Sequence, residues 1–391
     1  MSGVAIVGAG PAGSATALLL ARAGVAVRIV ERARFPRRKV CGEYLNAGAV
    51  AALQRLGVLD AVRAVAAPLR GVRLVARGAA PLTLPFAREA LACPRDVLDA
   101  LLLEAACAAG ARVERARAEE AIVERGRCVG VRVRDDDGTL RELRAGAVVG
   151  ADGVGSLVAR KLGLAKPSRG EPRYAIGGHY EGFEALDGHV EMYAGEGAYF
   201  ALNPLGGDRA NVMVVVPRAR LARWSHDVDA GVGGAAAALG AGVRSFAGAT
   251  RSGERVSVGP LAHAVRRAAA PGALLAGDAA GFLDPFTGQG VFLALTSAED
   301  AAQTLLAALR EPAREAALFD AYGRRRAADL RARGRLCTAV ATLVRVPVLA
   351  RRAARRLARF PDAAAALLDA LGGVTPPQRA FRPGVLGRIV A

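Results

Sequence analysis

The sequence predicts an α/β protein with a parallel sheet suited to a dinucleotide, an inserted antiparallel sheet and a C-terminal helical segment. Three observations lead to this prediction. A short apolar strand at residues 4–7 runs into a glycine-rich turn and a helix. The same strand–loop–helix order returns near residues 148 and 273. Between residues 172 and 217, short strand patterns follow one another without a helix, which is typical of an antiparallel sheet.

The N-terminal turn carries a G-x-G-x-x-G pattern between a strand and a helix, the context that dinucleotide binding requires. We expect Gly8 to make the tight turn, Gly10 to let a pyrophosphate approach the backbone, and Gly13 to let helix and strand pack closely. A second strand, residues 26–30, ends at Glu31. Glu31 stands where the ribose-binding acid belongs, so the sequence predicts a Rossmann-like domain.

A second ligand-binding pattern occupies residues 277–290, which are rich in glycine and proline. An apolar strand, residues 273–276, precedes it, and a helix beginning near Val291 follows. A carboxylate at the carboxyl end of a buried strand, followed by a helix N-terminus, is typical of a ligand site. Asp278 is placed to accept hydrogen bonds from a sugar or polyol. The amides of residues 288–290 can face an electron-rich heterocycle.

A third pattern lies at residues 148–160, where a buried strand ends in Gly-Ala-Asp-Gly and a helix starts near Ser156. The N-terminal G-x-G-x-x-G, this motif and the late Gly-Asp-Ala-Ala-x-x-x-x-Pro-x-x-Gly-x-Gly, in this order, resemble the FAD-dependent class A monooxygenases. Those enzymes share the para-hydroxybenzoate-hydroxylase fold with flavin halogenases and geranylgeranyl reductases. The resemblance covers roughly the first five-sixths of the chain and implies FAD as the cofactor.

The resemblance also implies a set of cofactor-binding residues. It places Glu31 on the adenosine ribose, Asp278 on the ribityl chain and the backbone of Ala118 near the adenine. Arg95, at the start of a helix over residues 95–109, matches an arginine that meets the FAD phosphate or ribityl chain; the alternative is a solvated charge in the first helical turn. The expected set is Gly8, Gly10, Pro11, Ala12, Gly13, Glu31, Arg32, Val40, Cys41, Arg95, Ala118, Asp152, Gly153, Gly277, Asp278, Pro285, Gly288, Gln289 and Gly290.

The loop after the second strand contains Cys41-Gly42-Glu43, and Pro36 excludes a continuing helix there. A free cysteine is most often a small buried residue. This run, however, is similar to the Cys-Gly-(Glu/Asp) motif of the geranylgeranyl-reductase branch, which implies that Cys41 lies beside the flavin and the substrate. Since no base is evident near it in the sequence, we expect Cys41 to lie at the flavin without acting as a covalent catalyst.

The antiparallel strands are expected to roof a substrate pocket over the flavin, as the resemblance implies. Tyr193, Tyr199 and Met213 are the candidate pocket residues, and they indicate an apolar small-molecule substrate. The alternative is that these side chains belong to the core of the sheet. In the geranylgeranyl-reductase branch this region carries Tyr-x-Trp-x-Phe-Pro. Here Ala201 and Asn203 stand at the Trp and Phe positions, which argues against a long isoprenoid substrate.

Two reactions stay open for such an NAD(P)H-driven oxidoreductase. The intact Gly-Ala-Asp-Gly motif favours a monooxygenase of secondary metabolism, which would capture oxygen as a flavin C4a-hydroperoxide and hydroxylate an apolar aromatic or polyketide-like molecule. The alternative is a carbon–carbon double-bond reductase of the geranylgeranyl-reductase type. Halogenation is disfavoured because Trp224 is the only tryptophan and no W-x-W-x-I-P motif occurs. A third hypothesis is a non-catalytic protein that binds FAD or another ligand.

These patterns divide the chain into a discontinuous cofactor domain, an inserted substrate domain and a helical tail. Residues 219–247 are expected to alternate helix and turn, and residues 256–260 to return the chain to the cofactor domain. The expected parts are 1–70, 95–165 and 250–323 for the FAD-binding domain, 71–94 and 166–249 for the substrate domain, and 324–391 for the C-terminal helical region.

The amino-acid composition argues against several other classes of protein. The 391 residues are 52% apolar, without an apolar run of 18, so a globular protein is expected. The five cysteines show no C-x-x-C pair and the four histidines are scattered, so we expect reduced thiols in a cytoplasm and no metal site. Nucleic-acid binding is not expected despite a net charge of +18, because aromatics are only 5% and no nucleic-acid motif occurs. We expect a monomer.

The basic excess is concentrated in the tail. Residues 324–359 contain twelve arginines against one acid, Asp329, with apolar residues at helical spacing up to Val346 and again after Pro347. One interpretation is a helical layer that packs on the FAD domain with its arginines in water. The other is a peripheral contact of residues 324–360 with an anionic membrane, from which an apolar substrate would be taken.

Overall fold

The computed structural model describes residues 3–76, 79–168, 171–195, 198–221 and 244–390. Its first sheet has the strand order β18-β19-β9-β1-β2-β6-β7-β8. β1 lies at the centre and pairs in parallel with β2 and β9, as predicted from the N-terminal pattern. The strands are β1 (Val4–Val7), β2 (Val27–Glu31), β6 (Arg112–Glu124), β7 (Arg127–Asp135), β8 (Leu140–Arg144), β9 (Ala147–Gly150), β18 (Ala269–Ala270) and β19 (Ala273–Leu275).

Helices cover this sheet and complete its core. α1 (Pro11–Arg22) packs between α4 (Arg95–Ala108) and α8 (Gly290–Arg310). The strands β1, β2, β9 and β19 contribute Val, Ile, Leu and Ala side chains that are almost fully buried, as expected of parallel strands covered on both faces. Shorter elements nearby are α2 (Ala47–Arg55), α3 (Leu59–Arg63), α5 (Leu157–Lys161), β10 (Ala165–Lys166), β17 (Ala264–Val265), and the 3-10 turns η1 (Gly277–Ala280), η2 (Pro285–Thr287) and η3 (Pro312–Arg314).

The second sheet is mostly antiparallel and has the order β15-β11-β14-β13-β12-β4-β5-β3, with β16 also paired to β11. The four strands predicted between residues 172 and 217 are present as β11 to β14. β4 joins them through a parallel pairing with β12. The strands are β3 (Tyr44–Leu45), β4 (Ala67–Ala76), β5 (Leu82–Ala92), β11 (Arg173–Glu181), β12 (His189–Gly195), β13 (Ala198–Gly206), β14 (Arg209–Pro217), β15 (Thr250–Arg251) and β16 (Val256–Val258).

The boundary of this sheet differs from the predicted one. β16 pairs with β11 from Ala175 to Gly177, so residues 256–258 belong to the antiparallel sheet instead of returning directly to the cofactor sheet. Most of the predicted helix–turn alternation over residues 219–247, with Trp224, lies outside the described residues.

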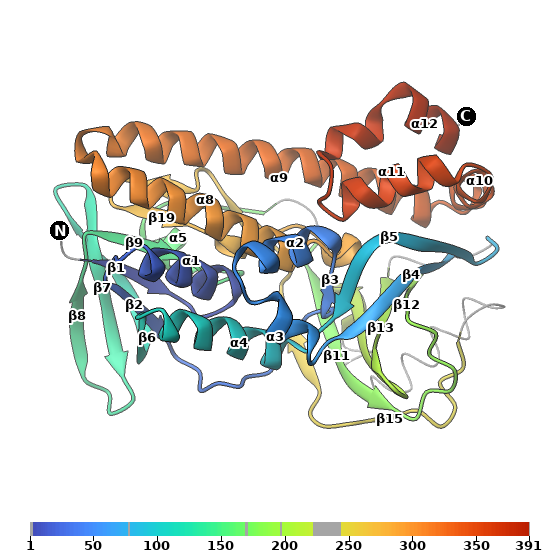
Figure 1. Cartoon of the computed structure of the whole chain (residues 1–391), viewed down its shortest axis with the longest axis horizontal. Helices are drawn as coiled ribbons and strands as arrows, with labels where there is room; N and C mark the ends of the chain where they lie inside the picture. Colours follow the sequence, from blue (N-terminus) through green and yellow to red (C-terminus); the bar gives the residue numbers. More distant parts are fainter. Residues whose placement is uncertain (1–2, 77–78, 169–170, 196–197, 222–243, 391) are drawn as a thin grey trace.

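The C-terminal helices lie along one side of the molecule (Figure 1). α9 runs beside α8, and α10, α11 and α12 lie over the end of the β4–β5 hairpin. The predicted break at Pro347 is confirmed, because proline cannot donate the backbone hydrogen bond that would continue α9 and instead opens α10. The elements are α9 (Glu315–Arg345), α10 (Pro347–Arg359), α11 (Pro361–Leu371), η4 (Pro377–Phe381) and α12 (Pro383–Val390). Among the described residues, no helix combines the length and the apolar character needed to span a bilayer.

Candidate functional site

Four predicted motifs meet at one edge of the parallel sheet. Gly8 follows β1, Glu31 ends β2, Ala151 follows β9, and Gly277 comes shortly after β19. These four strands are neighbours with parallel pairing, so their carboxyl ends lie at the same edge. A crevice at the carboxyl ends of parallel strands is where ligands bind in open α/β sheets.

The glycines of the first motif perform the predicted structural tasks. Gly8 has a φ of +100°, which favours glycine, and so makes the tight turn. A Cβ on Gly13 would lie 1.9 Å from the Gly8 carbonyl oxygen, so helix and turn can approach this closely only without a side chain. Glu31 accepts hydrogen bonds from the backbone N–H groups of Ala9 (2.9 Å) and Ala33 (2.8 Å). Its carboxylate keeps acceptor capacity for the hydroxyls of a ribose.

Two helix N-termini meet the same crevice. α1 begins at Pro11 and α8 at Gly290, and neither has a side-chain cap, so their first amides stay available to a ligand. The N-terminus of a helix is favourable for an anion. A Cβ on Gly290 would meet no atom within 4 Å, and one on Gly10 would meet only the Arg37 side chain, at 3.7 Å. The backbone at both positions is therefore open to a bound pyrophosphate or ring system.

The crevice opens into a cavity with about 1340 Å³ of empty space. Most of the predicted cofactor residues line it, together with two of the three predicted substrate residues. Those in its wall are Gly10, Pro11, Ala12, Val40, Cys41, Arg95, Gly153, Gly277, Asp278, Pro285, Gly288, Gln289, Gly290, Tyr199 and Met213.

Charged side chains in the wall of this cavity shift one another's pKa values. Burial raises the pKa of Asp278, and the nearby Lys39, Arg95 and His263 partly offset that effect. Burial also lowers the pKa of Lys39, and the positive charges of Arg95 and Arg37 lower it further. A cavity whose wall combines the cations Lys39 and Arg95 with carboxylates such as Asp278 suits a ligand with both phosphates and polyol hydroxyls.

Arg95 is buried, so the alternative of a solvated first-turn charge is wrong. Its guanidinium makes two hydrogen bonds of 2.8 Å to the fully buried Asp99, one turn further along α4. Arg37 lies 3.4 Å from the same carboxylate. Asp99 therefore fixes the direction of Arg95 at the cavity wall, and a bidentate pair of this kind gives a defined orientation.

The loop over residues 277–290 is anchored from the antiparallel sheet. The Tyr199 hydroxyl donates to Asp284 Oδ1 (2.6 Å), and Arg173 donates to the other carboxylate oxygen (3.1 Å). Asp284 also caps η2 by accepting from the Phe286 N–H. The predicted pocket residue Tyr199 thus lines the cavity and holds the cofactor loop at the same time.

The same loop is anchored from the C-terminal helices. The buried Arg333 of α9 donates to Gln289 Oε1 (3.1 Å) and to Asp329 (2.8 Å), and it lies over the Phe292 ring. Arg326 is buried as well. The interpretation that placed the tail arginines in water is wrong for these two residues: Arg333 contacts the cofactor loop, and Arg326 is buried beside Asp329.

The Cys41-Gly42-Glu43 loop is held by two asparagines of the sheet. Asn211 donates to the Cys41 carbonyl oxygen (2.6 Å) and Asn203 to the Gly42 carbonyl oxygen (3.0 Å). The two asparagines face each other across β13 and β14. Cys41 is half-buried, and its sulfur accepts from the Glu43 N–H (3.3 Å). The loop therefore presents Cys41 to the cavity in a fixed position.

Six predicted cofactor residues do not line this cavity: Gly8, Gly13, Glu31, Arg32, Ala118 and Asp152. Asp152 accepts from the Ser156 hydroxyl (2.5 Å) and from the Leu157 N–H (2.6 Å), so its carboxylate caps α5. Ala118 lies within β6, paired with Val133, and Arg32 is exposed just after β2. Their contacts with the cofactor stay predictions, as do those of Gly8, Gly13 and Glu31 with its adenosine end.

Tyr193 does not belong to the pocket, and this prediction is wrong. Its ring is fully buried, stacked on Phe200, and its hydroxyl bonds to the Glu191 carboxylate. Side chains alternate between the two faces of a strand, so on β12 it is Met192 that faces the cavity. The pattern of aromatics alone did not indicate which face the pocket uses.

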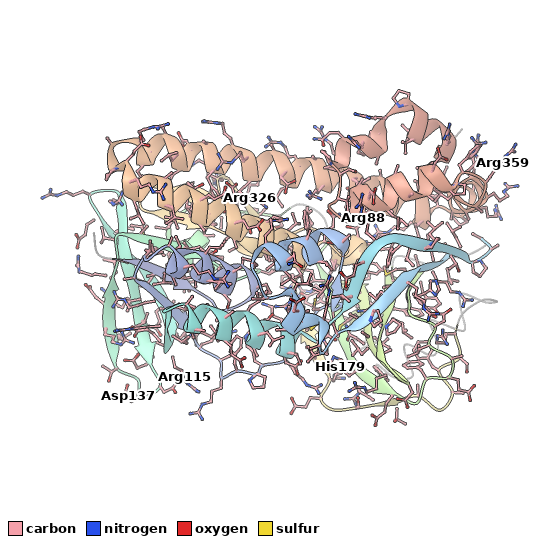
Figure 2. The ribbon with its side chains drawn as sticks, viewed as in Figure 1. Arg88, Arg115, Asp137, His179, Arg326 and Arg359 are labelled. Atoms are coloured by element: carbon pink, nitrogen blue, oxygen red, sulfur yellow. The ribbon has the colours of Figure 1, made fainter. Side chains whose placement is uncertain are left out.

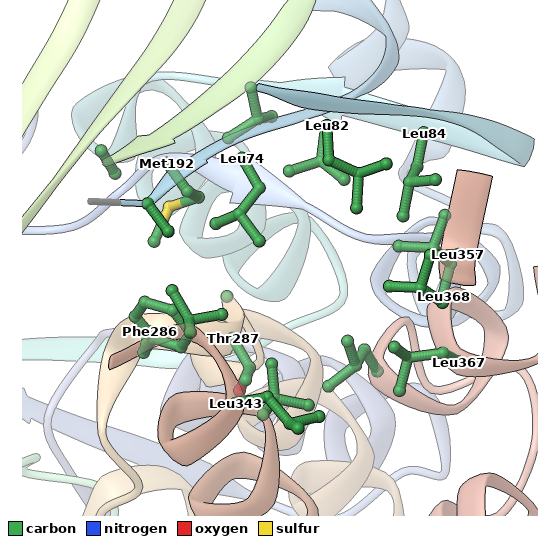
Figure 3. Close-up of a pocket in the computed structure, with 18 of the residues that line it drawn as sticks. Leu74, Leu82, Leu84, Met192, Phe286, Thr287, Leu343, Leu357, Leu367 and Leu368 are labelled. Atoms are coloured by element: carbon green, nitrogen blue, oxygen red, sulfur yellow. The ribbon is translucent and has the colours of Figure 1, made fainter. Parts of the chain in front are cut away.

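A second cavity, with about 1380 Å³ of empty space, adjoins the first (Figure 3). It lies between the antiparallel sheet and the C-terminal helices, where Leu74, Leu82 and Leu84 face Leu343, Leu357 and Leu367. None of the described residues that line it is charged. The residues common to both cavities are Gly42, Tyr44, Met192, Ala201, Pro285 and Gly288.

The comparisons with known proteins agree with this geometry. The family profile described as "FAD binding domain" matches residues 1–333. The chain belongs to this family of FAD-binding oxidoreductases. The crevice of helix N-termini, Glu31, Lys39 and Asp278 fits that cofactor.

Relatives in the family include enzymes named as reductases. The chain is 32% identical over 331 residues to digeranylgeranylglycerophospholipid reductase 1 of Methanopyrus kandleri, covering 82% of this chain and 84% of that protein. It is 31% identical over 319 residues to menaquinone reductase of Mycolicibacterium smegmatis, covering 77% and 76%. A solved structure of a flavin-dependent brominase triple mutant has a TM-score of 0.84 at 20% identity and covers 99% of both chains, which supports the fold.

Sequence reasoning missed several residues of the site. It did not pair Glu43 with His179, although Glu43 Oε2 lies 2.8 Å from His179 Nε2. It also did not place the tail helices in the wall of the apolar cavity. The apolar residues at helical spacing in the tail could have indicated that these helices pack on another surface of the protein. The first pair is separated by 136 residues, and no local pattern joins them.

Proposed function

We propose that this chain is a reductase that uses FAD to add hydrogen across a carbon–carbon double bond of an elongated apolar substrate, with NAD(P)H as the reductant. The observation that carries the proposal is the uncharged cavity that adjoins the cofactor cavity at Gly42, Met192 and Ala201. A hydrocarbon chain in the second cavity would bring one end to the cofactor. FAD, when bound and reduced, supplies a hydride for such chemistry.

The walls of this cavity favour a flexible hydrocarbon over a polar substrate. Apart from Tyr44, Asn203 and Thr287, its lining side chains are apolar, and Asn203 is already bonded to the Gly42 carbonyl. Burying apolar surface there is worth about 25 cal/mol per Å². Polar groups of a substrate would lose water without finding partners. The chain's contribution is therefore to bind the hydrocarbon, to orient it at the cofactor and to exclude water.

Ala201 removes the sequence-based argument against an isoprenoid. The Tyr-x-Trp-x-Phe-Pro run of geranylgeranyl reductases has a Trp at this position, and the smaller Ala201 lies in the wall of both cavities. The substitution leaves room where the cavities meet. The names of the two relatives at 31% and 32% identity, both reductases and one of a digeranylgeranyl lipid, support the same substrate class.

The hypothesis of a monooxygenase depended on the Gly-Ala-Asp-Gly motif. In the structure the Asp152 carboxylate is engaged with the N-terminus of α5, a role that serves either reaction equally. Hydroxylation of the same apolar substrate is therefore the alternative against which the reductase must be tested.

One experiment separates the hypotheses. The yellow protein is mixed with NADPH or NADH without oxygen, and the flavin absorbance is followed; geranylgeraniol is then added, still without oxygen. A reductase bleaches with the nicotinamide and regains its colour with the polyprenol, which is recovered with fewer double bonds. Recovery of colour only with oxygen, with an oxygenated product, would establish the monooxygenase instead. A protein that never bleaches is a binding protein.

We also propose that the substrate reaches the apolar cavity from an anionic membrane surface. The inner face of α10 contributes Ala350, Ala353 and Leu357 to the apolar cavity. Its outer face exposes Arg351 and Arg355. Figure 2 shows Arg359, the last residue of α10, at the outer end of the molecule. A helix that separates an apolar cavity from a basic outer surface is suited to a lipid interface.

A further inference from the structure

Addition of hydrogen across a double bond needs a proton as well as a hydride. One new C–H bond takes the hydride and its electron pair from the reduced cofactor, and the other takes a proton from the solvent. The apolar cavity cannot carry that proton, since no charged residue lines it among the described residues. The substrate cavity and the proton path must therefore be separate.

Glu43 lies in the wall between the cofactor cavity and a small outer pocket. The outer pocket has about 270 Å³ of empty space, and its lining includes Glu43, His179 and the exposed Arg38. Glu43 lines the cofactor cavity as well, whereas His179 lines only the outer pocket. In Figure 2, His179 lies on the side of the molecule away from the C-terminal helices. The outer pocket and the apolar cavity thus meet the cofactor cavity at different residues.

The contact between Glu43 and His179 is short and fixed. Glu43 Oε2 lies 2.8 Å from His179 Nε2, while Glu43 Oε1 accepts from the Arg95 N–H (3.0 Å). Glu43 is buried and adopts a φ of +58°, a left-handed conformation that is uncommon for residues other than glycine. The Cys93 N–H donates to the Glu43 carbonyl (3.0 Å) and helps to hold that conformation. A buried carboxylate in a strained backbone position is a feature that clusters at functional sites.

Other ionisable groups surround Glu43 from each element packed against it. Burial raises the pKa of the Cys93 thiol to about 12, and the carboxylate of Glu43 contributes to that shift, so this thiol keeps its proton. The guanidinium of Arg95 is paired with Asp99 and also lies beside the Cys41 thiol. His179 is therefore the neighbour whose ring contacts the Glu43 carboxylate through one nitrogen and has a second nitrogen that can exchange a proton with water. The surrounding groups are Arg38, Lys39, Cys41, Cys93, Arg95, Asp96, Asp99 and His179.

From this geometry we infer that Glu43 and His179 form a proton relay, in which His179 takes a proton from water in the outer pocket and Glu43 delivers it to the substrate carbon in the cofactor cavity. Glu43 is the catalytic residue of the pair, and His179 is the positioning residue that reloads it. The inference rests on the proposed reductase activity. The stoichiometry balances: the hydride and this proton add to the two carbons, and the cofactor is left oxidised.

The test compares three variants in the FAD-loaded protein. Glu43→Gln keeps the size of the side chain but cannot deliver a proton. His179→Gln keeps a nitrogen donor for the Glu43 carboxylate but cannot relay. His189→Gln is the matched control, since His189 also lies beside a carboxylate, Asp187 at 3.0 Å, outside both cavities. The readout is the rate at which geranylgeraniol restores flavin colour without oxygen, measured across pH.

We expect Glu43→Gln to slow that rate roughly 100-fold. His179→Gln should slow it as well and abolish the dependence on pH, while His189→Gln matches the parent protein. FAD content should stay unchanged in all three. If His179→Gln retains both the rate and the pH profile, the pair is structural and the inference is wrong. Because His179→Gln is a separate variant that leaves Glu43 in place, the outcome does not depend on whether Glu43→Gln folds.

A second readout does not require turnover. In protein labelled with ¹⁵N-histidine, the relay predicts a proton on His179 Nε2 that is hydrogen-bonded to Glu43, and a redistribution between the ring nitrogens in Glu43→Gln. An unchanged tautomer in that variant would overturn the inference. If the parent protein bleaches but never responds to the polyprenol, the proposed reductase activity fails, and the ¹⁵N signals still decide whether the pair is coupled.

Discussion

Asn203 on β13 donates its side-chain amide to the carbonyl oxygen of Gly42, 3.0 Å away in the cofactor loop. Asn203 stands where the geranylgeranyl-reductase run has a Phe, so the departure from that run has a structural explanation. With Asn211, it ties the Cys41-Gly42-Glu43 loop to the antiparallel sheet. The sheet therefore determines the position of Cys41 and Glu43 relative to the cofactor.

Asn203→Ala should loosen this loop. The half-buried Gly42 carbonyl would lose its partner, at a cost of about 1 kcal/mol in the free energy of unfolding. We expect a lower thermal midpoint and faster modification of Cys41 by a thiol reagent, both measured on the purified protein. Gln378→Ala, which removes an exposed amide, is the control. Equal labelling rates in both variants would show that Asn203 does not hold the loop.

The two acids at the ends of β2 and β19 should determine FAD affinity. Glu31→Ala and Asp278→Ala each leave hydroxyls of the bound cofactor without partners, which should weaken binding by about 1–3 kcal/mol. Flavin fluorescence on titration of the apoprotein measures the change. Asp320→Ala, at an exposed acid of α9, should bind FAD like the parent protein. Full flavin content and unchanged affinity in both acid variants would contradict the assignment.

Asp278 should also make the stability of the apoprotein depend on pH. Burial raises its pKa in the folded protein above the ordinary value of 3.8, despite the opposing effect of Lys39 and Arg95. The folded protein therefore binds this proton more tightly than the unfolded chain. The contribution of Asp278 to stability is fully present below pH 3.8 and is lost as the pH rises through the raised value.

Asp278→Asn removes this titration. We expect the variant to gain stability relative to the parent apoprotein as the pH rises from about 4 to 7, while losing FAD affinity. Thermal midpoints measured across that range check it, with Asp320→Asn as the control. A stability difference that does not change with pH would show that Asp278 is not destabilised by its burial.

Cys41→Ser should keep FAD and slow turnover only modestly. The thiol lines the cavity and its sulfur accepts a hydrogen bond from the Glu43 N–H. The Arg95 guanidinium beside it is not the base that a covalent catalyst needs. Flavin reduction and substrate turnover are measured separately. Complete loss of turnover with normal flavin reduction would show that the thiol is an acid or a nucleophile.

The parallel sheet was predictable because each of its motifs is local. Gly8, Glu31 and Asp278 each stand at the end of an apolar strand, and the ends of parallel strands must meet at one edge. The break of the tail helix at Pro347 was predictable for the same kind of reason, since a missing N–H acts at one position. Such features need no knowledge of the tertiary structure.

The rest depended on contacts between distant segments. Whether Tyr193 or Met192 points into the cavity depends on which face of β12 meets the cofactor site. The two residues are neighbours, so their side chains point to opposite faces. The burial of Arg326 and Arg333 depends on how α9 packs against the rest of the protein, and Arg333 contacts the cofactor loop there. The apolar cavity needs the β4–β5 hairpin and three tail helices together. None of these could be obtained from spacing along the chain.

The last prediction concerns the outer surface of α10. Val348 is 63% exposed and Val346 41% exposed, and Arg345, Arg351 and Arg355 are exposed around them. Apolar side chains among arginines on the outer wall of an apolar cavity suit anionic lipid, and each arginine near such a surface is worth about 1 kcal/mol. We expect the protein to sediment with phosphatidylglycerol vesicles at low salt and to be released at high salt, because exposed charges are screened within about 10 Å at 0.1 M.

Charge reversal distinguishes this surface from a general attraction of a basic protein. The double substitution Arg351→Glu and Arg355→Glu should abolish sedimentation at low salt, since it removes two charges and adds two of the opposite sign beside Val348. The same change at Arg112 and Arg117, exposed on β6, alters the net charge equally but lies on the cofactor sheet. If both double variants bind alike, attraction is spread over the whole protein. If the parent protein stays in the supernatant at low salt, α10 only packs against the cavity and the substrate arrives from solution.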